Sequence, residues 1–169
     1  AILFFGRANC VSCHAVAGPS NEMFSDFRQH VAGIPQLMPA SGNVTFDGPG
    51  ANEDFGLEQV TGDPNDRYAF RSSPLRNLAL QPTFFHNGCF TGLEDAVRYH
   101  LDAIGSAPSY DPVSAGVDVD LQGPMGPIGP VLARIDPALA TPITLTDEEF
   151  RQLVLFLRNG LLDPKANAH

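Results

Sequence analysis

The chain has 169 residues, of which 43% are hydrophobic, and this is long enough for a single domain with its own core. Its 16 glycines and 15 prolines predict that much of the chain is turn and loop. The 19 acidic and 10 basic residues give a formal net charge of -9, which disfavours nucleic acids and anionic membrane surfaces as partners. No apolar run approaches the roughly 20 residues that span a bilayer, so we expect no membrane insertion.

The first residues are apolar and predict the end of a helix that leads to Cys10. They lack an initiator Met and a basic n-region, so we expect the chain to begin after a cleavage or within a longer protein. Residues 18–65 are crowded with Gly, Pro, Asn and Asp, which predicts a long irregular segment with one helical turn at 25–30. A long ordered loop in a domain of this size usually wraps around something.

The first clear helix is predicted at residues 92–104. Thr91 and Glu94 have the spacing of a capping box. The apolar residues form one stripe, which consists of Leu93, Ala96, Val97, Leu101 and Ile104. His100 falls on this stripe, whereas Tyr99 is expected to point away from it.

Residues 105–142 predict a second loop tract, whose Gly-Pro repeat is too short for a collagen helix. A last helix follows, with Thr146 and Glu149 as its capping box and Gly160 at its end. Its apolar stripe consists of Phe150, Leu153, Val154 and Leu157. The chain is therefore expected to contain a few helices joined by long loops, without a strand pattern that supports a sheet.

The sequence NCVSCH at residues 9–14 places two thiols and an imidazole within five positions. A structural zinc site needs four ligands, and Cys89 with His86 could complete one. A redox dithiol needs its CxxC between a strand and a helix, and no such context is apparent. With two of three cysteines in one motif, a disulfide framework is not expected, and Cys89 is interpreted as an unpaired core thiol or an intermolecular link.

The third chemistry is covalent attachment of haem c. Cys10 and Cys13, three positions apart on a helical turn, can each add to one vinyl group of the porphyrin. His14 is then held under the iron as the proximal ligand. A loop-rich chain with few strands favours this interpretation, because one haem supplies the large apolar group that a small helical core lacks.

The sixth ligand of such an iron has several candidates, which are His30, His86, His100, Met23, Met38, Met125, Tyr68, Tyr99 and Tyr110. We select His100, since an imidazole on the apolar face of the central helix points to where a buried cofactor lies. Met125, in the Gly-Pro loop, is second. A histidine on an apolar face can also be a core residue bonded to the backbone. Ligation by two histidines gives a lower potential than His/Met ligation and leaves no open position for peroxide.

Further segments are similar to those of a known family. They are YAFRSSPLRNLAL at 68–80, FFHNG at 84–88, LEDAV at 93–97, FFG at 4–6 before the CxxCH motif, and LTDEE at 145–149. Together they resemble the C-terminal haem domain of the bacterial dihaem cytochrome c peroxidase and MauG family. The resemblance implies an all-α, cytochrome c-like fold, with a few helices and long Gly/Pro-rich loops wrapped around one haem c over residues 1–169.

The resemblance also implies roles for particular residues. In this family the distal ligand of the electron-transfer haem, Met or Tyr, lies on the helix after the Phe-His-x-Gly segment, and a count from His86 brings that position to His100. A calcium ion between the two haem domains would involve Gln81 and Thr83, although a family Thr and Pro are replaced in this stretch. Arg71 and Arg76 are expected to pair with haem propionates or to form surface salt bridges.

Two functions remain open from the sequence. The chain is expected to be the electron-transfer half of a dihaem peroxidase or MauG-like oxidase, with an N-terminal peroxidatic haem domain or another redox protein as its partner. The alternative is a stand-alone monohaem electron carrier without catalytic activity. The chain has a single CxxCH, so peroxide chemistry would require a second haem elsewhere. Haem c and the family both indicate a periplasmic or otherwise exported protein.

Overall fold

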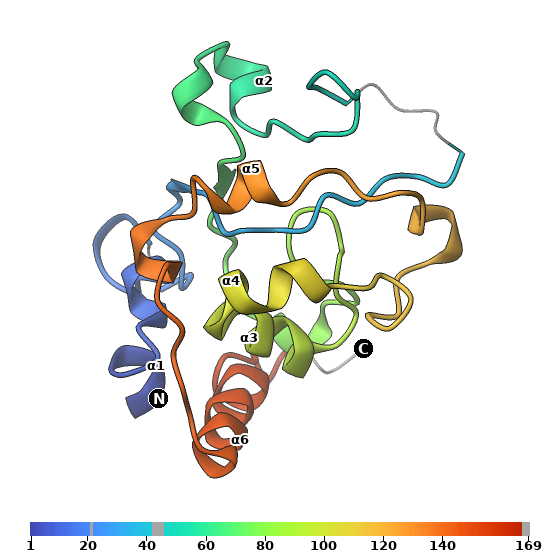
Figure 1. Cartoon of the computed structure of the whole chain (residues 1–169). Coiled ribbons are helices and arrows are strands. Elements are labelled where there is room, and N and C mark those ends of the chain that lie inside the picture. Colours follow the sequence, from blue (N-terminus) through green and yellow to red (C-terminus); the bar gives the residue numbers. More distant parts are fainter. Residues whose placement is uncertain (21, 42–45, 167–169) are drawn as a thin grey trace. The chain divides into compact units, whose positions relative to one another are not determined.

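The computed structural model describes residues 1–20, 22–41 and 46–166, and short helices joined by long irregular segments make up most of it (Figure 1). The α-helices are α1 (Ile2–Phe5), α2 (Glu58–Thr61), α3 (Leu93–Leu101), α4 (Ala103–Ser106), α5 (Gly129–Leu132) and α6 (Asp147–Leu155). Two-residue strands β1 (Gln29–His30) and β2 (Phe70–Arg71) pair with each other. The expected helix-rich, strand-poor architecture is therefore confirmed.

The chain forms two compact units, each assembled from separate stretches of sequence. Unit 1 consists of Ala1–Arg28, Arg71–Pro82 and Ile143–His169. Unit 2 consists of Gln29–Phe70 and Thr83–Pro142. The expectation of one haem domain over residues 1–169 stays a prediction.

Unit 1 is organised around α1, α6 and a cluster of phenylalanines. Phe4 is completely buried and has its ring centroid 5.7 Å from that of Phe24 and 5.4 Å from that of Phe156. Phe5 also contacts the rings of Phe24 and Phe156. Edge-to-face and tilted ring pairs of this kind add to the free energy gained by burial. The cluster fixes the N-terminal segment that precedes the CxxCH motif.

Helix α6 begins as the sequence predicts. The Thr146 hydroxyl accepts a hydrogen bond from the Glu149 N–H, and the Glu149 carboxylate accepts one from the Thr146 N–H, which completes the capping box. The predicted apolar stripe is buried, and it consists of Phe150, Leu153, Val154 and Leu157. The last turns widen into a π-helix at Phe156–Gly160.

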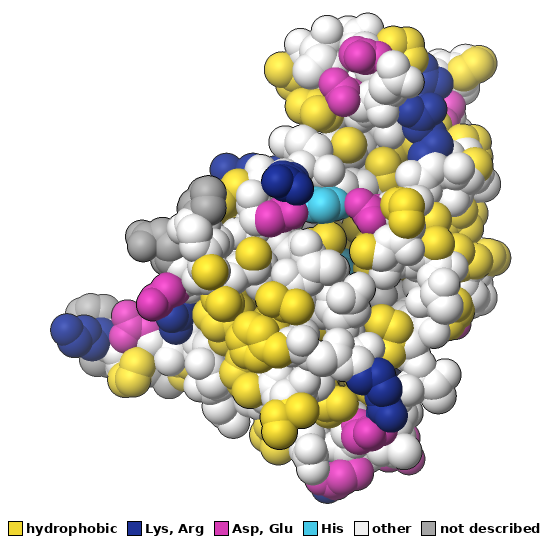
Figure 2. Space-filling model, turned by 90° about the vertical axis from the view of Figure 1, so that its left-hand side faces the viewer, with side chains coloured by type: hydrophobic (Ala, Val, Ile, Leu, Met, Phe, Trp, Pro, Cys, Tyr) yellow, Lys and Arg dark blue, Asp and Glu magenta, His cyan; other side chains and the backbone are white. Residues whose placement is uncertain are grey.

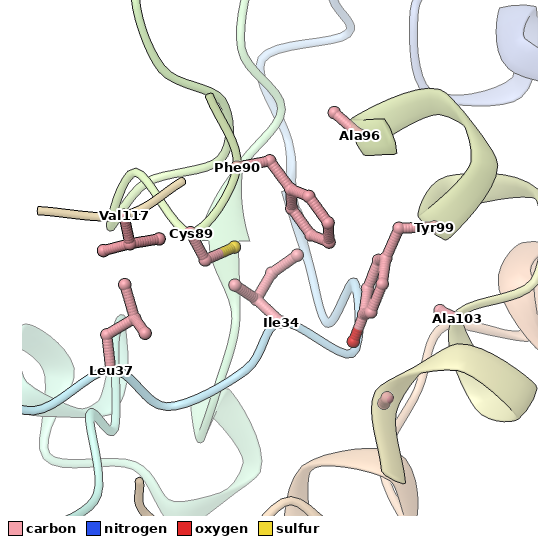
Figure 3. Close-up of a cluster of buried hydrophobic side chains, with 9 residues drawn as sticks. Ile34, Leu37, Cys89, Phe90, Ala96, Tyr99, Ala103 and Val117 are labelled. Atoms are coloured by element: carbon pink, nitrogen blue, oxygen red, sulfur yellow. The ribbon is translucent and has the colours of Figure 1, made fainter. Parts of the chain in front are cut away.

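Unit 2 has a separate apolar core, most of which Figure 3 labels. Its buried members are Ile34, Leu37, Cys89, Phe90, Ala96, Tyr99, Ala103, Ala107 and Val117. Helix α3 contributes Ala96 and Tyr99, and the Tyr99 hydroxyl donates a hydrogen bond to the Gly33 carbonyl at 2.6 Å. Phe90 lies against both Tyr99 and Tyr110 at ring centroid distances of 5.1 and 5.2 Å. The core thus joins α3 to the irregular segment around Gly33.

Three expectations for the irregular and central segments are wrong. The helix predicted at 92–104 breaks at Asp102, whose carboxylate caps α4 by accepting from the Gly105 N–H. Thr91 does not cap α3, because its hydroxyl donates to the Ala115 carbonyl. Tyr99 is buried and does not point away from the core.

The helical turn expected at residues 25–30 is also absent: residues 25–28 are irregular, with a left-handed backbone at Phe27 (φ 57°), and the stretch ends in β1. The Arg28 carbonyl accepts from the Ser72 N–H, so the backbone pairs with a distant segment in place of a local turn. Long-range pairing of this kind leaves no periodic signal in the sequence.

Several large apolar side chains lie at the surface, and Figure 2 shows apolar groups among charged ones on one face of the molecule. Among them, the side chains of Ile2, Val60 and Val119 are 90%, 84% and 77% exposed. Scattered apolar residues are normal at protein surfaces. Within residues 1–20, 22–41 and 46–166, no helix has the length and apolar character needed to cross a membrane.

Candidate functional site

The Cys10–His14 segment folds into one tight turn. Asn9 enters it with a left-handed backbone (φ 50°), and Cys10–Ser12 form a 3-10 turn. The N–H groups of Cys13 and His14 both donate to the Cys10 carbonyl, at 3.3 and 2.8 Å. Asn tolerates the left-handed conformation better than most residues. The turn therefore holds two thiols and an imidazole close together in unit 1.

The rest of unit 1 anchors this turn from two sides. The Asp26 N–H and the Ser72 hydroxyl both donate to the Cys13 carbonyl, at 2.8 and 3.2 Å. The Ser25 hydroxyl in turn donates to the Ser72 carbonyl at 2.7 Å. Segments 22–28 and 71–77 thus fix the backbone at the second cysteine, although they are far apart in the sequence.

His14 is oriented by a hydrogen bond to the backbone. Its Nδ1 lies 2.9 Å from the Phe24 carbonyl oxygen. A carbonyl can only accept, so Nδ1 carries the proton in this bond and a neutral His14 has its lone pair on Nε2. A hydrogen bond at one ring nitrogen sets the tautomer and orientation of a metal-binding histidine in this way.

The environment of the thiols disfavours a redox dithiol. Burial, opposed by a backbone hydrogen bond and reinforced by Cys13, raises the pKa of Cys10 to about 11. Reactive dithiols depend on a lowered thiol pKa, so this turn lacks that property. In unit 2, Cys89 is fully buried within the apolar core, and burial also raises the pKa of its thiol.

The donor set of the turn fits haem c better than zinc. In the part of the chain that the structure describes, no group of three or more His, Cys, Asp and Glu side chains could hold a metal ion. Two cysteines and an adjacent histidine of fixed tautomer match what covalent haem requires: two thioether anchors and one axial nitrogen.

The two arginines assigned to haem propionates lie in unit 1, next to the segment that anchors the turn. Arg76 donates from Nε to the Glu22 carbonyl at 3.0 Å, and its Nη2 lies 3.6 Å from the Glu22 carboxylate. The Arg71 guanidinium lies 5.7 Å from the centre of the Phe27 ring. Arg76 therefore has a carboxylate partner, Glu22, as the salt-bridge alternative expects. A propionate role for either arginine stays a prediction.

His100 lies near the end of α3 in unit 2, and its ring stacks on Phe85 with centroids 5.8 Å apart. Its side chain is half-buried, unlike the fully buried Tyr99 beside it. His14 and His100 belong to different units, so their pairing on one iron stays a prediction.

The other histidine candidates interact with acidic side chains inside unit 2. His30 Nδ1 lies 2.8 Å from the Asp136 carboxylate. His86 stacks on Phe70 at 3.5 Å, and its Nε2 lies 3.5 Å from the Asp54 carboxylate. Each of these two rings thus has a carboxylate partner within its own unit.

The remaining candidates are tyrosines and methionines. All three phenols donate within unit 2: Tyr68 to Glu53, Tyr99 to the Gly33 carbonyl and Tyr110 to the Cys89 carbonyl. Met23 and Met125 are exposed and Met38 is half-buried.

The proposed calcium residues, Gln81 and Thr83, both have exposed side chains. They lie on either side of the boundary between the units, which falls after Pro82. A calcium site at this stretch stays a prediction.

One pair of buried polar residues was missed by the sequence analysis. The Tyr68 hydroxyl donates to the Glu53 carboxylate, and both side chains are buried in unit 2. The residues are 15 positions apart in a loop without periodicity, so no pattern connects them. Glu53 lies in the irregular segment expected at 18–65, and Tyr68 begins the family-like segment at 68–80, so the two residues were never considered together.

Comparisons with known proteins agree with the motif analysis. Cytochrome-c peroxidase IdrP2 of Pseudomonas sp. (strain SCT) is 29% identical over 126 residues, which are 66% of this chain and 33% of that protein. The diheme peroxidase BthA from Burkholderia thailandensis E264 matches with a TM-score of 0.62 and 26% identity, covering 97% of this chain and 41% of that one. A MauG-like protein associated with microbial copper homeostasis matches in fold, with a TM-score of 0.63 and 24% identity over 97% of this chain and 46% of its own. No family model matches the chain.

In fold and in sequence the chain is therefore similar to dihaem peroxidases and MauG-like proteins. The resemblance to the bacterial dihaem cytochrome c peroxidase and MauG family is confirmed. The chain spans about a third of the length of the curated relatives it matches, 33% and 31% of the first two.

Proposed function

We propose that the chain is the electron-transfer haem c domain of a dihaem cytochrome c peroxidase or MauG-like oxidase. The observation that carries the proposal is the anchored turn at Cys10–His14, where two thiols precede a histidine whose Nδ1 is bonded to the Phe24 carbonyl. The similarity to peroxidases over most of the chain supports it. The long loops would then wrap around the haem.

In this proposal each residue of the turn has one task. Cys10 and Cys13 hold the haem through thioethers, and His14 presents Nε2 to the iron. Bound haem c supplies a one-electron iron couple. The Phe24 carbonyl makes His14 a more basic ligand through the Nδ1 hydrogen bond.

We propose His100 as the second axial ligand. Its place on α3 and the use of Tyr68, Tyr99 and Tyr110 in hydrogen bonds within unit 2 favour it over a tyrosine. An iron with two histidine ligands has no open coordination position. The domain would thus carry electrons, and peroxide would react at a second haem outside this chain.

The partner in this proposal is an N-terminal peroxidatic haem domain or another redox protein, and the protein is periplasmic or otherwise exported. Propionate contacts of Arg71 and Arg76 and a calcium ion near Gln81 and Thr83 belong to the same proposal. The alternative is a stand-alone monohaem electron carrier without catalytic activity.

The experiment is an intact-mass measurement and an absorption spectrum of the full-length protein. Two covalent haems, with the α- and β-bands of a low-spin haem c on reduction, are expected. One covalent haem in the complete protein would favour the monohaem carrier. A protein without a Soret band would overturn both proposals in favour of a zinc or dithiol module.

A further inference from the structure

A buried tyrosine and a buried carboxylate form a hydrogen-bonded pair in unit 2. The Tyr68 hydroxyl donates to Oε2 of Glu53, and the two residues are 2% and 7% exposed. A carboxylate this deeply buried is uncommon without a cationic partner. The nearby guanidinium of Arg67 donates to the carboxylate of Glu58 and interacts electrostatically with both Glu53 and Tyr68, while the side-chain hydrogen bond to Glu53 comes from the Tyr68 phenol.

Both members of the pair are held by the backbone around them. The Tyr68 N–H donates to the Phe55 carbonyl at 2.9 Å, and the Leu57 N–H donates to the Ala69 carbonyl at 3.0 Å. Tyr68 adopts a left-handed backbone with φ 64°, which is an outlier for a bulky side chain and needs surrounding structure to maintain it. The Phe55 ring meets the Tyr68 ring edge-to-face at 5.8 Å.

The space for the carboxylate depends on a glycine. Gly48 has φ 78°, and a Cβ built on it would collide with the Glu53 carboxylate. The Asp47 and Glu53 backbones exchange hydrogen bonds of 2.7 and 3.2 Å, which close the loop that contains this glycine. The carboxylate therefore reaches the phenol along a path that only glycine leaves open.

Tyr68 differs chemically from the other two tyrosines. Tyr99 donates to the Gly33 carbonyl at 2.6 Å, and Tyr110 donates to the Cys89 carbonyl at 2.5 Å. A backbone carbonyl accepts a hydrogen bond but is far too weak a base to take the proton, whereas a carboxylate can take it. The chain contains three tyrosines and no tryptophan, so few aromatic side chains could carry an oxidising equivalent.

The proton of Tyr68 limits its oxidation. Burial, reinforced by the Glu53 carboxylate and opposed by the Arg67 guanidinium, raises the pKa of Tyr68 to about 12, so the phenol is protonated at neutral pH. Loss of an electron alone would leave a radical cation in a buried site, which is costly. A base already bonded to the hydroxyl removes this cost.

We propose that Tyr68, with Glu53 as its proton acceptor, is a redox-active tyrosine that stores one oxidising equivalent in this chain. The phenol gives one electron to a one-electron oxidant, its O–H bond breaks, and the proton moves to the Glu53 carboxylate, which leaves a neutral phenoxyl radical and a carboxylic acid. Reduction by one electron returns the proton to Tyr68. Inside the protein the oxidant would be a haem in an oxidised state, and that part rests on the proposed function.

The test uses the full-length protein and a photo-oxidised ruthenium tris-bipyridine complex, which needs no haem. Rapid freezing traps the radical for electron paramagnetic resonance. Tyr68→3-fluorotyrosine keeps the phenol and should add fluorine hyperfine splitting to the signal. The matched labels, Tyr99→3-fluorotyrosine and Tyr110→3-fluorotyrosine, should leave the signal unchanged.

Glu53→Gln keeps an acceptor oxygen but removes the base, and should slow radical formation roughly 100-fold, as expected for loss of a positioned general base. Circular dichroism checks that this variant is folded. Splitting from the label at Tyr99 or Tyr110, absence of splitting from the label at Tyr68, or an unchanged rate in folded Glu53→Gln would each overturn the proposal. A protein without haem would contradict the proposed function, but the radical formed by the ruthenium complex could still be measured.

Discussion

The three cysteines of the chain occupy two contrasting regions. Cys10 and Cys13 are half-buried on a tight turn of unit 1, with His14 next in the chain. Cys89 is fully buried in the apolar core of unit 2, with Ile34 and Val117 in the same cluster (Figure 3). Irregular backbone thus holds one pair of thiols that we propose as the haem anchors, while the third packs in the core as a small apolar side chain.

The contrast extends to the histidines. His14 is bonded to a backbone carbonyl, which leaves its ring in a tautomer suited to iron. His30 and His86 instead interact with the carboxylates of Asp136 and Asp54. A residue type alone therefore does not identify a ligand, and the assignment of His14 depends on the two cysteines that precede it in the same turn.

The largest expected effect separates the two kinds of cysteine. Cys10→Ala combined with Cys13→Ala should abolish covalent haem, because both thioether bonds are lost. Haem staining after denaturing electrophoresis and intact mass measure the result. Cys89→Ala is the matched control and should retain full attachment. Covalent haem in the double variant would contradict the assignment of the turn.

The second prediction concerns His100. His100→Met should raise the reduction potential by on the order of 0.1 V, within the roughly 0.8 V range that axial ligands span. His100→Gly should let exogenous imidazole bind the iron, seen as a shift of the absorption bands. His86→Gln is the control and should change neither. If both His100 variants keep the wild-type spectrum, another residue is the ligand.

The third prediction compares the two cores. Leu153→Ala in unit 1 and Ile34→Ala in unit 2 should each lower the free energy of unfolding by about 2–5 kcal/mol, because both side chains are buried. The chain passes repeatedly between the units, so we expect one cooperative transition in urea. Ile2→Ala, at a side chain that is 90% exposed, should change stability by less than about 0.5 kcal/mol. Two separate transitions, each sensitive to one variant, would show that the units unfold independently.

The smallest effect involves the ion pair between His30 and Asp136 in unit 2. Burial alone would raise the pKa of Asp136, but hydrogen bonds from His30 and the Ala138 N–H outweigh it and lower the pKa from 3.8. A carboxyl with a lowered folded-state pKa stabilises the fold above its unfolded value, and this stabilisation is lost as pH falls through the folded pKa. The stability difference between wild type and Asp136→Asn should therefore shrink as pH falls below about 4. Urea titrations measure the free energy of unfolding, with Asp118→Asn as the control. A stability difference between wild type and Asp136→Asn that grows towards acid pH would contradict the predicted direction.

Local structure was predictable from the sequence. The capping box of α6 and its buried stripe involve residues at most a few positions apart, so the pattern contains all the required information. The same holds for the CxxCH turn, whose hydrogen bonds from Cys13 and His14 close within the motif.

Long-range contacts explain the failures. Thr91 is at the position expected for an N-cap, but its hydroxyl donates a hydrogen bond to the carbonyl of Ala115, 24 residues later. Tyr99 lay off the expected stripe, yet the Gly33 carbonyl, 66 residues earlier, provides the acceptor that lets a phenol be buried. The Glu53–Tyr68 pair joins two loop positions in the same way. Such partners follow from the tertiary fold and not from local sequence.

The packing of side chains near the C-terminal end depends on the number of residues in the widened turn at Phe156–Gly160. A π-turn has more residues per turn than an α-helix, so the residues beyond it lie on a different side of the helix from where ordinary α-helical winding would place them. Leu157 and Leu161 are four apart and both buried, and Phe156 still meets the ring of Phe4. Removal of one residue here would restore ordinary winding and rotate one of these side chains out of the core. A single-codon deletion at this turn would thus damage a site that most point substitutions leave intact.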